Sequence, residues 1–168
     1  VYDARPAPDD AAGQALLARF KGRRLPMVDR VEISIIEESQ PRWLAFLNGE
    51  AFLGLMRDVT GEPRLALADA QQTRNRAGHF LTEHDDHAEG KNRFFAYVLN
   101  LTPAWRIEWG GLLAFHEAGD AIAEAFIPTF NSLNLFGVPQ RHSVTMVTPF
   151  TPRRRYSVTG WLRTGPKP

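Results

Sequence analysis

The stretch Leu81-Thr82-Glu83-His84-Asp85-Asp86-His87 precedes an apolar run over residues 94–101. It places two of the chain's five histidines beside three carboxylates within seven residues. If the stretch is extended, side chains two residues apart share a face, so His84 and Asp86 point the same way and Asp85 points the opposite way. One imidazole beside one carboxylate makes half of a metal site, and the remaining ligands should come from elsewhere in the chain.

Length, charge and composition exclude several classes of protein. The 168 residues suffice for one domain with a sizeable core. The formal net charge of +1 gives no electrostatic argument for nucleic acid or for a membrane surface, so we predict neither as a partner. No apolar run reaches the length that spans a bilayer, and no secretory signal pattern opens the sequence. The sequence begins at Val1 rather than at Met, so we expect an N-terminal piece to be missing.

The chain contains no cysteine. Disulfides and zinc–thiolate sites are therefore excluded, and any metal must be held by nitrogen and oxygen ligands. A reducing compartment fits this composition, and we predict a cytoplasmic location.

The first third of the chain is predicted to mix helix and strand. Its predicted elements are a short helix over 9–20, a half-buried strand over 31–35 and a helix over 43–56. Ser39 before Pro41 favours a helix start, and Gly61 with Pro63 ends the last helix.

Beyond Pro63 the pattern changes to short alternating segments separated by turn residues, which is typical of a sandwich or barrel. The predicted strands span 64–69, 78–87, 93–101, 111–117, 121–127, 132–137, 142–150 and 156–163. The segment between 69 and 78 is interpreted as a polar link. We therefore predict a mainly β protein with N-terminal helices, one domain over 1–168, in which 1–62 supports a β core over 63–168.

The third metal ligand should lie on a distant strand, and His79, His116 and His142 are the remaining histidines. His142 opens a predicted strand, and further along comes Arg155-Tyr156-Ser157-Val158-Thr159-Gly160-Trp161. An arginine on the inner face of a barrel is costly to bury unless an anion meets it.

Arg155 shares one strand face with Ser157 and Thr159, while Arg153 and Arg154 compete with it for the anion. Two histidines and one carboxylate on one side of an octahedral metal are typical of non-haem iron(II) oxygenases. A deeper arginine would anchor the far carboxylate of a dicarboxylate co-substrate.

A longer set of residues appears in an order that belongs to one known family. The matching pieces are His84-Asp85-Asp86, Arg93, Tyr97-Val98-Leu99-Asn100, Trp105, Gly110-Gly111-Leu112-Leu113, Pro128, Asn131, Leu135-Phe136, His142-Ser143-Val144 and the segment from Arg155 to Trp161. Over about residues 78–164 the sequence resembles the prolyl hydroxylase branch of the iron(II)- and 2-oxoglutarate-dependent oxygenases, including the ribosomal-protein type. The strand phase together with this match selects Arg155 among the three arginines.

The resemblance implies a double-stranded β-helix, the jelly-roll or cupin-like fold, with iron near one open end. Carried over by position, His84, Asp86 and His142 would ligate Fe(II). Arg155 would pair with the C5 carboxylate of 2-oxoglutarate, and Ser157 would add a hydrogen bond there.

One position departs from the family pattern. Five residues before Trp105, where such enzymes often carry a tyrosine that bonds the co-substrate carboxylate, this chain has Asn100. An amide can donate the same bond over a shorter reach, so we assign Asn100 to the co-substrate pocket. Tyr97 lies three residues earlier and should face the other side of the strand.

The resemblance further implies oxidative decarboxylation of 2-oxoglutarate to succinate and CO2, with O2 as oxidant and ascorbate in support, coupled to hydroxylation of a prolyl residue in a protein or peptide. No side-chain general base beyond the metal ligands is required. Two alternatives remain open: the same chemistry on a free amino acid or other small molecule, and a β-barrel binding module without catalysis.

The other conspicuous residues are given structural roles. His87 and Asp85 lie on the wrong face of the predicted strand. His79 is expected to pack or to face solvent, and His116 to lie on the surface. The aromatic rings of Trp161 and Phe150 are expected in the core.

Overall fold

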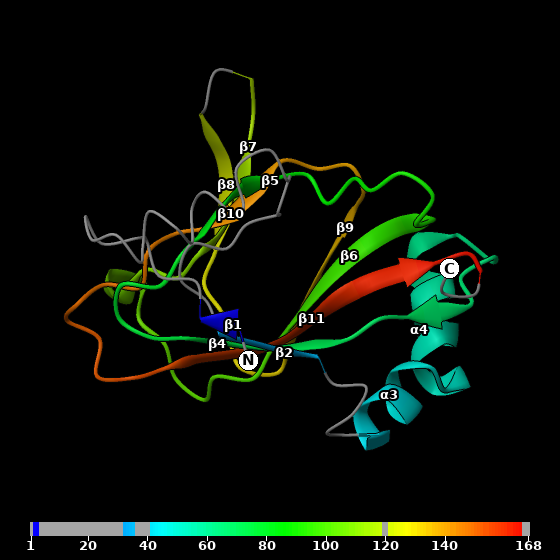
Figure 1. Ribbon diagram of the computed structural model, residues 1–168, viewed down its shortest axis with the longest axis horizontal. Helices are drawn as coiled ribbons and strands as arrows, with labels where there is room; N and C mark the ends of the chain where they lie inside the picture. Colours follow the sequence, from blue (N-terminus) through cyan, green and yellow to red (C-terminus); the bar gives the residue numbers. More distant parts are fainter. Residues whose placement is uncertain (1, 4–31, 36–40, 119–120, 166–168) are drawn as a thin grey trace.

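A computed structural model describes residues 2–3, 32–35, 41–118 and 121–165, which form two antiparallel sheets with helices beside the larger one (Figure 1). The helix expected over 9–20 lies outside the described residues. Within the described ranges, no helix combines the length and the apolar character needed to cross a membrane.

The larger sheet has the strand order β1-β2-β4-β11-β6-β9, with β3 paired to β11. Its strands are β1 (Tyr2–Asp3), β2 (Glu32–Ile35), β3 (Leu67–Ala68), β4 (Gln71–Asn75), β6 (Arg93–Asn100), β9 (Ser132–Gly137) and β11 (Arg155–Arg163). The strand expected over 31–35 is thus confirmed, and through β2 the N-terminal region extends the same sheet.

The smaller sheet has the order β5-β10-β7-β8. Its strands are β5 (Leu81–His84), β10 (His142–Val144), β7 (Leu113–His116) and β8 (Ile122–Phe126), and the 3-10 turn η1 (Ile107–Trp109) precedes β7. From β4 onwards the chain crosses repeatedly between the sheets, so that sequence neighbours β4, β5 and β6 lie in alternate layers. This winding is the double-stranded β-helix, and the predicted fold class is confirmed. That residues 1–168 form one domain stays a prediction.

Strand β4 was not expected, because its sequence Gln71-Gln72-Thr73-Arg74-Asn75 has no apolar alternation. It nevertheless pairs with β2 on one side and β11 on the other. A strand normally reveals itself by the apolar residues on its buried face. Here the face that carries Thr73 and Asn75 contacts the polar side chains of Ser157 and Arg155 on β11 and not the apolar core.

The helix expected over 43–56 is two helices, α3 (Pro41–Leu47) and α4 (Glu50–Thr60). The break lies at Asn48, whose side chain accepts a hydrogen bond from the backbone N–H of Ala68 (2.8 Å) and donates to the Ala68 carbonyl (3.0 Å). These bonds fasten the helix junction to β3. Gly61 ends α4 in the left-handed conformation (φ 69°), as predicted.

The strand expected over 142–150 was also too long, since only 142–144 lies in β10. Beyond it, Val147 meets Gly110 in an isolated bridge, and the N–H of Gly111 bonds the Met146 carbonyl. Both glycines have a φ of 64°, and a Cβ on Gly110 would lie 2.0 Å from the Met146 oxygen. This close approach directs the chain away from the sheet.

The larger sheet has one apolar face and one polar face. The apolar face packs on α3 and α4, which lie on the side of β6 and β11 away from the small sheet (Figure 1). The buried apolar cluster comprises Leu47, Phe52, Leu53, Met56, Leu65, Ala68, Ala70, Tyr97, Val158 and Leu162. Side chains of alternate residues on the same strands are buried and polar: Asn75, Asn100, Arg155 and Ser157. Because strand side chains alternate, these polar groups lie on the face opposite the helices.

Candidate metal centre

Three side chains from different parts of the small sheet converge on one point. His84 ends β5, Asp86 follows in the next loop and His142 begins β10. One ligand atom from each lies within 4.8 Å of the others. The two Asp86 oxygens are each 3.5 Å from one histidine Nε2, Oδ1 from His84 and Oδ2 from His142. The structure therefore brings together the three predicted ligands, and their binding of a metal stays a prediction.

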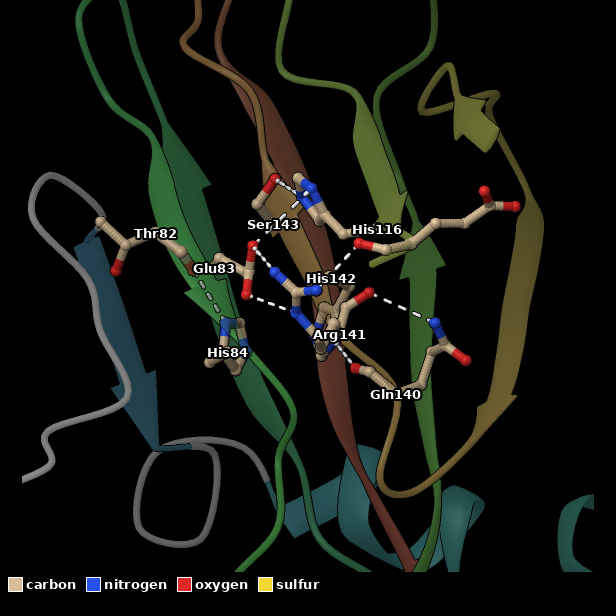
Figure 2. Close-up of polar contacts among 9 residues, drawn as sticks. Thr82, Glu83, His84, His116, Gln140, Arg141, His142 and Ser143 are labelled. Atoms are coloured by element: carbon tan, nitrogen blue, oxygen red, sulfur yellow. Dashed lines mark hydrogen bonds and ion pairs between the residues drawn. The ribbon is translucent and has the colours of Figure 1, made fainter. Parts of the chain in front are cut away.

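The backbone fixes the orientation of both imidazoles. The Nδ1 of His84 lies 2.9 Å from the carbonyl of Thr82, and the Nδ1 of His142 lies 2.7 Å from that of Gln140 (Figure 2). A carbonyl partner makes Nδ1 the donor and leaves the Nε2 lone pair for a metal. Both rings thus present the atom that points towards Asp86.

Asp86 reaches this position by a route that strand alternation did not predict. β5 ends at His84, so Asp86 is not in the strand, and its φ of 62° is left-handed. The expectation of one extended strand through residue 87 was wrong. Aspartate tolerates this region better than most residues because its short polar side chain can bond locally. The left-handed turn aims the carboxylate at the histidines.

The electrostatics of the centre favour an ionised carboxylate. Burial would raise the pKa of Asp86, but the hydrogen bond from His84 and the charges of His142 and His84 hold that pKa below its usual value. Burial acts to lower the pKa of His84, yet its contacts with Asp86 outweigh this and the pKa rises. Burial and the neighbouring charge of His84 lower the pKa of His142. Asp86 is therefore held in the form that binds a cation.

These donors fit ferrous iron. Two imidazoles and one carboxylate are a borderline donor set, and three protein ligands leave coordination positions for small ligands. The His84 and His142 rings lie 4.1 Å apart between centroids, with Phe136 4.7 Å from the latter. The apolar ring limits water around the centre.

Arg155 lies on the polar face of the larger sheet and is 2% exposed. Its Nη1 donates to Asn75 Oδ1 and to Ser157 Oγ, both at 3.4 Å. Within the described part of the chain, its Nε has no hydrogen-bond partner and no carboxylate pairs with its guanidinium. Complete burial lowers the pKa of Arg155 to about 10. A buried cation without a counter-charge indicates a place for an anion. Arg153 and Arg154, the competing arginines, are exposed.

Ser157 and Asn100 lie beside Arg155 on the same face. The Oγ of Ser157 is 2.6 Å from that of Thr73. The amide of Asn100 donates to Asn134 Oδ1 (2.8 Å), and its own Oδ1 has no partner among the described residues. The donor that Asn100 was expected to offer to a carboxylate is thus engaged with a neighbour, and its co-substrate role stays a prediction.

Tyr97 faces the helices, as expected. Its ring packs against Phe52, and its hydroxyl donates to the Asp69 carbonyl at 2.6 Å. Burial raises the pKa of Tyr97. The tyrosine therefore belongs to the apolar core and does not reach the polar face.

The other three histidines differ in how far they are buried. His79 is buried and accepts a hydrogen bond from Arg76, and His87 is exposed, as expected. His116 was expected on the surface and is instead mostly covered, with its Nε2 2.8 Å from Ser143 Oγ on the outer side of the small sheet (Figure 2). Its burial was missed because the strand partner that covers it is distant in sequence.

The two aromatic predictions differ in outcome. Phe150 is 83% exposed, so its placement in the core was wrong. It follows Pro149 in the loop after β10, where no sheet covers it. Trp161 is half-buried on β11, with the guanidinium of Arg93 over its ring.

Sequence reasoning missed two residues that contact the predicted site residues. Asn75 contacts Arg155 from the unexpected strand β4. Arg93 was noted only within the family pattern, yet it bonds the backbone of Asp86. The alternation of the polar residues Thr73 and Asn75 was the signal that could have identified Asn75.

Comparison with known proteins agrees with this geometry. Residues 70–163 match the sequence profile of the 2OG-Fe(II) oxygenase superfamily. Prolyl 3-hydroxylase OGFOD1 of Mus musculus is 29% identical over 128 residues, which cover 72% of this chain and 22% of that protein. The chain thus spans about a fifth of the length of this relative.

Solved structures share the fold. A Pseudomonas putida prolyl-4-hydroxylase has a TM-score of 0.65 at 23% identity, covering 89% of this chain and 84% of that one. A 2OG-Fe(II) oxygenase family oxidoreductase from Burkholderia pseudomallei has a TM-score of 0.68 at 18% identity, covering 98% and 84%. A Trichoplax adhaerens prolyl hydroxylase in complex with a hypoxia inducible factor peptide fragment has a TM-score of 0.58 at 18% identity, covering 80% and 63%.

The profile match extends from the strand that carries Asn75 to the end of β11, and so contains the three predicted ligands and Arg155. It covers more than half of the sequence. The chain belongs to the 2OG-Fe(II) oxygenase superfamily, whose members use Fe(II), 2-oxoglutarate and O2.

Proposed function

We propose that the protein is an Fe(II)- and 2-oxoglutarate-dependent dioxygenase that hydroxylates a prolyl residue in a protein or peptide. The observation that carries the proposal is the convergence of His84, Asp86 and His142 in the barrel that also buries Arg155 without a carboxylate partner among the described residues. A metal site alone fits many activities. A metal site in the same fold as a buried arginine that lacks a carboxylate partner among the described residues fits a dicarboxylate co-substrate.

The protein's own residues would hold the metal and orient the co-substrate. His84 and His142 would bind the metal through Nε2, and Asp86 would complete the set. Arg155 would bind the far carboxylate of 2-oxoglutarate through a charge-assisted pair. Bound iron supplies the activation of O2, so that 2-oxoglutarate, O2 and a substrate C–H group yield succinate, CO2 and the hydroxylated substrate.

The prolyl substrate is supported by the relatives. The curated relative is named a prolyl 3-hydroxylase, and two of the structural neighbours are prolyl hydroxylases, one of them bound to a peptide fragment. A free amino acid or other small molecule is the alternative substrate, and a non-catalytic binding module is the alternative function. A cytoplasmic location also stays a prediction, which fractionation of cells would check.

Succinate formation tests the chemistry. The protein is incubated with Fe(II), ascorbate and 2-oxoglutarate, with and without proline-containing polypeptides. We expect succinate from the native protein and none from His84→Ala or Asp86→Ala. Turnover that persists in either variant contradicts the ligand assignment.

Mass spectrometry tests the substrate. An added oxygen atom on a polypeptide prolyl residue supports the proposal, and the same gain on a free metabolite supports the alternative. Hydrolysis and chromatography against 3- and 4-hydroxyproline standards would then identify the carbon. Failure to bind Fe(II) or 2-oxoglutarate in calorimetry would favour the binding module.

A further inference from the structure

Asp86 holds its carboxylate towards the metal centre from an unusual backbone conformation. Its φ of 62° lies in the left-handed region, and it follows β5, an edge strand of the small sheet. A residue other than glycine stays in this region only when its surroundings hold it there. Since β5 ends before Asp86, the restraint must come from another element.

Arg93 provides that restraint from the larger sheet. It is the first residue of β6, and its Nη1 donates to the backbone carbonyl of Asp86 at 3.1 Å. Its guanidinium carbon lies 3.5 Å from the ring centroid of Trp161 on the neighbouring strand β11. One side chain therefore connects the loop that carries the carboxylate to the rigid sheet.

Trp161 acts on the same aspartate through Arg93. Its indole Nε1 has no hydrogen-bond partner among the described residues, and its ring carries the guanidinium of Arg93. The stacked pair of Arg93 and Trp161 therefore reaches Asp86 through the bond from Arg93 to the backbone carbonyl. Planar stacking of a guanidinium on an indole restricts the rotation of both groups.

The surrounding charges direct Arg93 towards Asp86. Its ladder neighbour Arg163 is paired with Asp69. Asp69 is thus engaged by Arg163, whereas Arg93 bonds Asp86.

We propose that Arg93, stacked on Trp161, is a positioning residue that locks Asp86 in its left-handed conformation and so raises the affinity of the centre for its divalent metal. The proposal rests on Asp86 being a ligand, and not on the identity of the substrate. Because Trp161 holds the guanidinium that bonds the Asp86 carbonyl, loss of either side chain releases the same residue.

Metal affinity measured without co-substrate or substrate is the direct test. The full chain, freed of metal, is titrated with Mn(II) in a calorimeter. We expect Arg93→Gln to weaken Mn(II) binding about tenfold, the effect typical of losing a group that orients a ligand. Arg93→Lys keeps a charged donor but not the planar stack, and should restore part of the affinity.

A double variant adds a readout that a merely structural role would not move. Trp161→Phe leaves a smaller aromatic ring under the guanidinium of Arg93, so we expect an intermediate loss of Mn(II) affinity. Arg93→Gln combined with Trp161→Phe should weaken Mn(II) binding by less than the product of the two single effects, because both act on Asp86.

Arg64 offers a matched control. Its guanidinium also lies over an aromatic ring, 5.1 Å from the centroid of Phe94, and it is paired with Glu62 on the surface. Arg64→Gln should leave Mn(II) affinity unchanged. The unfolding temperature of metal-free Arg93→Gln should stay within about 2 °C of the native value.

Two results would overturn the proposal. One is native Mn(II) affinity in Arg93→Gln with weaker binding of the polypeptide substrate, which would make Arg93 a substrate contact. The other is a large fall in the unfolding temperature of the metal-free variant, which would make the role structural. The variants could show the expected Mn(II) affinities while the native protein hydroxylates no prolyl residue. That combination would support the positioning role of Arg93 and contradict only the proposed substrate.

Discussion

Asn75 and Arg155 form a pair of buried polar side chains whose hydrogen-bonding capacity is incompletely used. Asn75 accepts a bond from Arg155, while its own Nδ2 has no partner in the described part of the chain. A donor that is 1% exposed and unpaired beside a buried cation is well placed to bind the same anion. We infer that both residues contribute to the co-substrate site.

Asn75→Leu should therefore weaken the binding of 2-oxoglutarate. Loss of one hydrogen bond to a charged group is worth about 1.5 kcal/mol, or about tenfold in affinity. Calorimetric titration of the Mn(II)-loaded protein with 2-oxoglutarate measures it. Gln72→Leu is the control, because Gln72 lies on the opposite face of β4 and pairs with Val158. Equal losses in the two variants would contradict the assignment.

Arg155→Met should separate stability from binding. Removing a buried charge without a counter-ion relieves its desolvation, so the unfolding free energy of the metal-free protein should not fall and should rise by about 1 kcal/mol. Binding of 2-oxoglutarate should be lost. Urea unfolding and calorimetry check the two parts, and Arg153→Met, at an exposed position, should change neither.

At single positions the sequence predicted which residues belong to the site better than it predicted their backbone conformation. His84, Asp86 and His142 were identified, but the argument for Asp86 assumed a strand that ends earlier. Residue types limit which ligands are possible, while the left-handed turn depends on contacts with β6 that are not encoded locally. Asn75 was missed because its partner Arg155 is 80 residues away.

The strand that carries His84 is weakly held within its sheet. β5 lies at the edge, and its ladder with β10 has a register irregularity between His142 and Val144. On the outer side, directly behind the histidines, Arg141 bonds both oxygens of Glu83 at 2.7 and 2.9 Å (Figure 2). It also donates to the Glu117 carbonyl. This cluster reinforces the irregular ladder.

Arg141→Gln should loosen β5 without destabilising the whole molecule. Both Arg141 and Glu83 are more than a third exposed, and exposed ion pairs contribute about 0–1 kcal/mol. The unfolding free energy should change by less than about 1 kcal/mol, while backbone amides of 81–84 exchange with deuterium faster. Arg57→Gln, which breaks the pair with Glu50 on α4, is the control. Unchanged exchange in 81–84 would exclude a role for the cluster.

Asn48→Ala should destabilise the protein through the junction of α3 and α4. The variant leaves the backbone N–H and carbonyl of Ala68 without their partner, which costs about 1–3 kcal/mol. Asn48→Asp keeps the acceptor and should lose less. Urea unfolding gives the values, and a loss below a few tenths of a kcal/mol in Asn48→Ala would show that the junction is held by packing alone.

Elements were predictable where one face meets the apolar core. β6 and β9 appear close to their expected limits, because β6 is a continuous apolar run and apolar residues alternate at the start of β9. β4 was not predicted because all five of its residues are polar, and the helix break at Asn48 depends on a strand 20 residues away. Local patterns report burial in an apolar environment and fail where the buried environment is polar.

On the scale of the whole molecule, the two faces of the larger sheet have different roles. Its helix-facing side holds the apolar cluster, and its other side holds the polar groups near Arg155. Ligands that bind only the folded protein should raise the unfolding temperature, by an amount that grows with ligand concentration. We expect Mn(II) with 2-oxoglutarate to do so in thermal unfolding, and Asp86→Ala to abolish the response to Mn(II). An equal shift in Asp86→Ala would place metal binding elsewhere.

The marginal position of β5 also bears on how the protein acquires its metal. Two of the three predicted ligands lie on this edge strand and the loop after it, whereas the apolar cluster involves neither. The chain can therefore complete its core before any metal arrives, and local opening of one strand suffices to admit or release the ion. Maturation is then a late step that follows folding, and metal-free protein purified under chelation should be reconstituted in the folded state with a cation of the experimenter's choice.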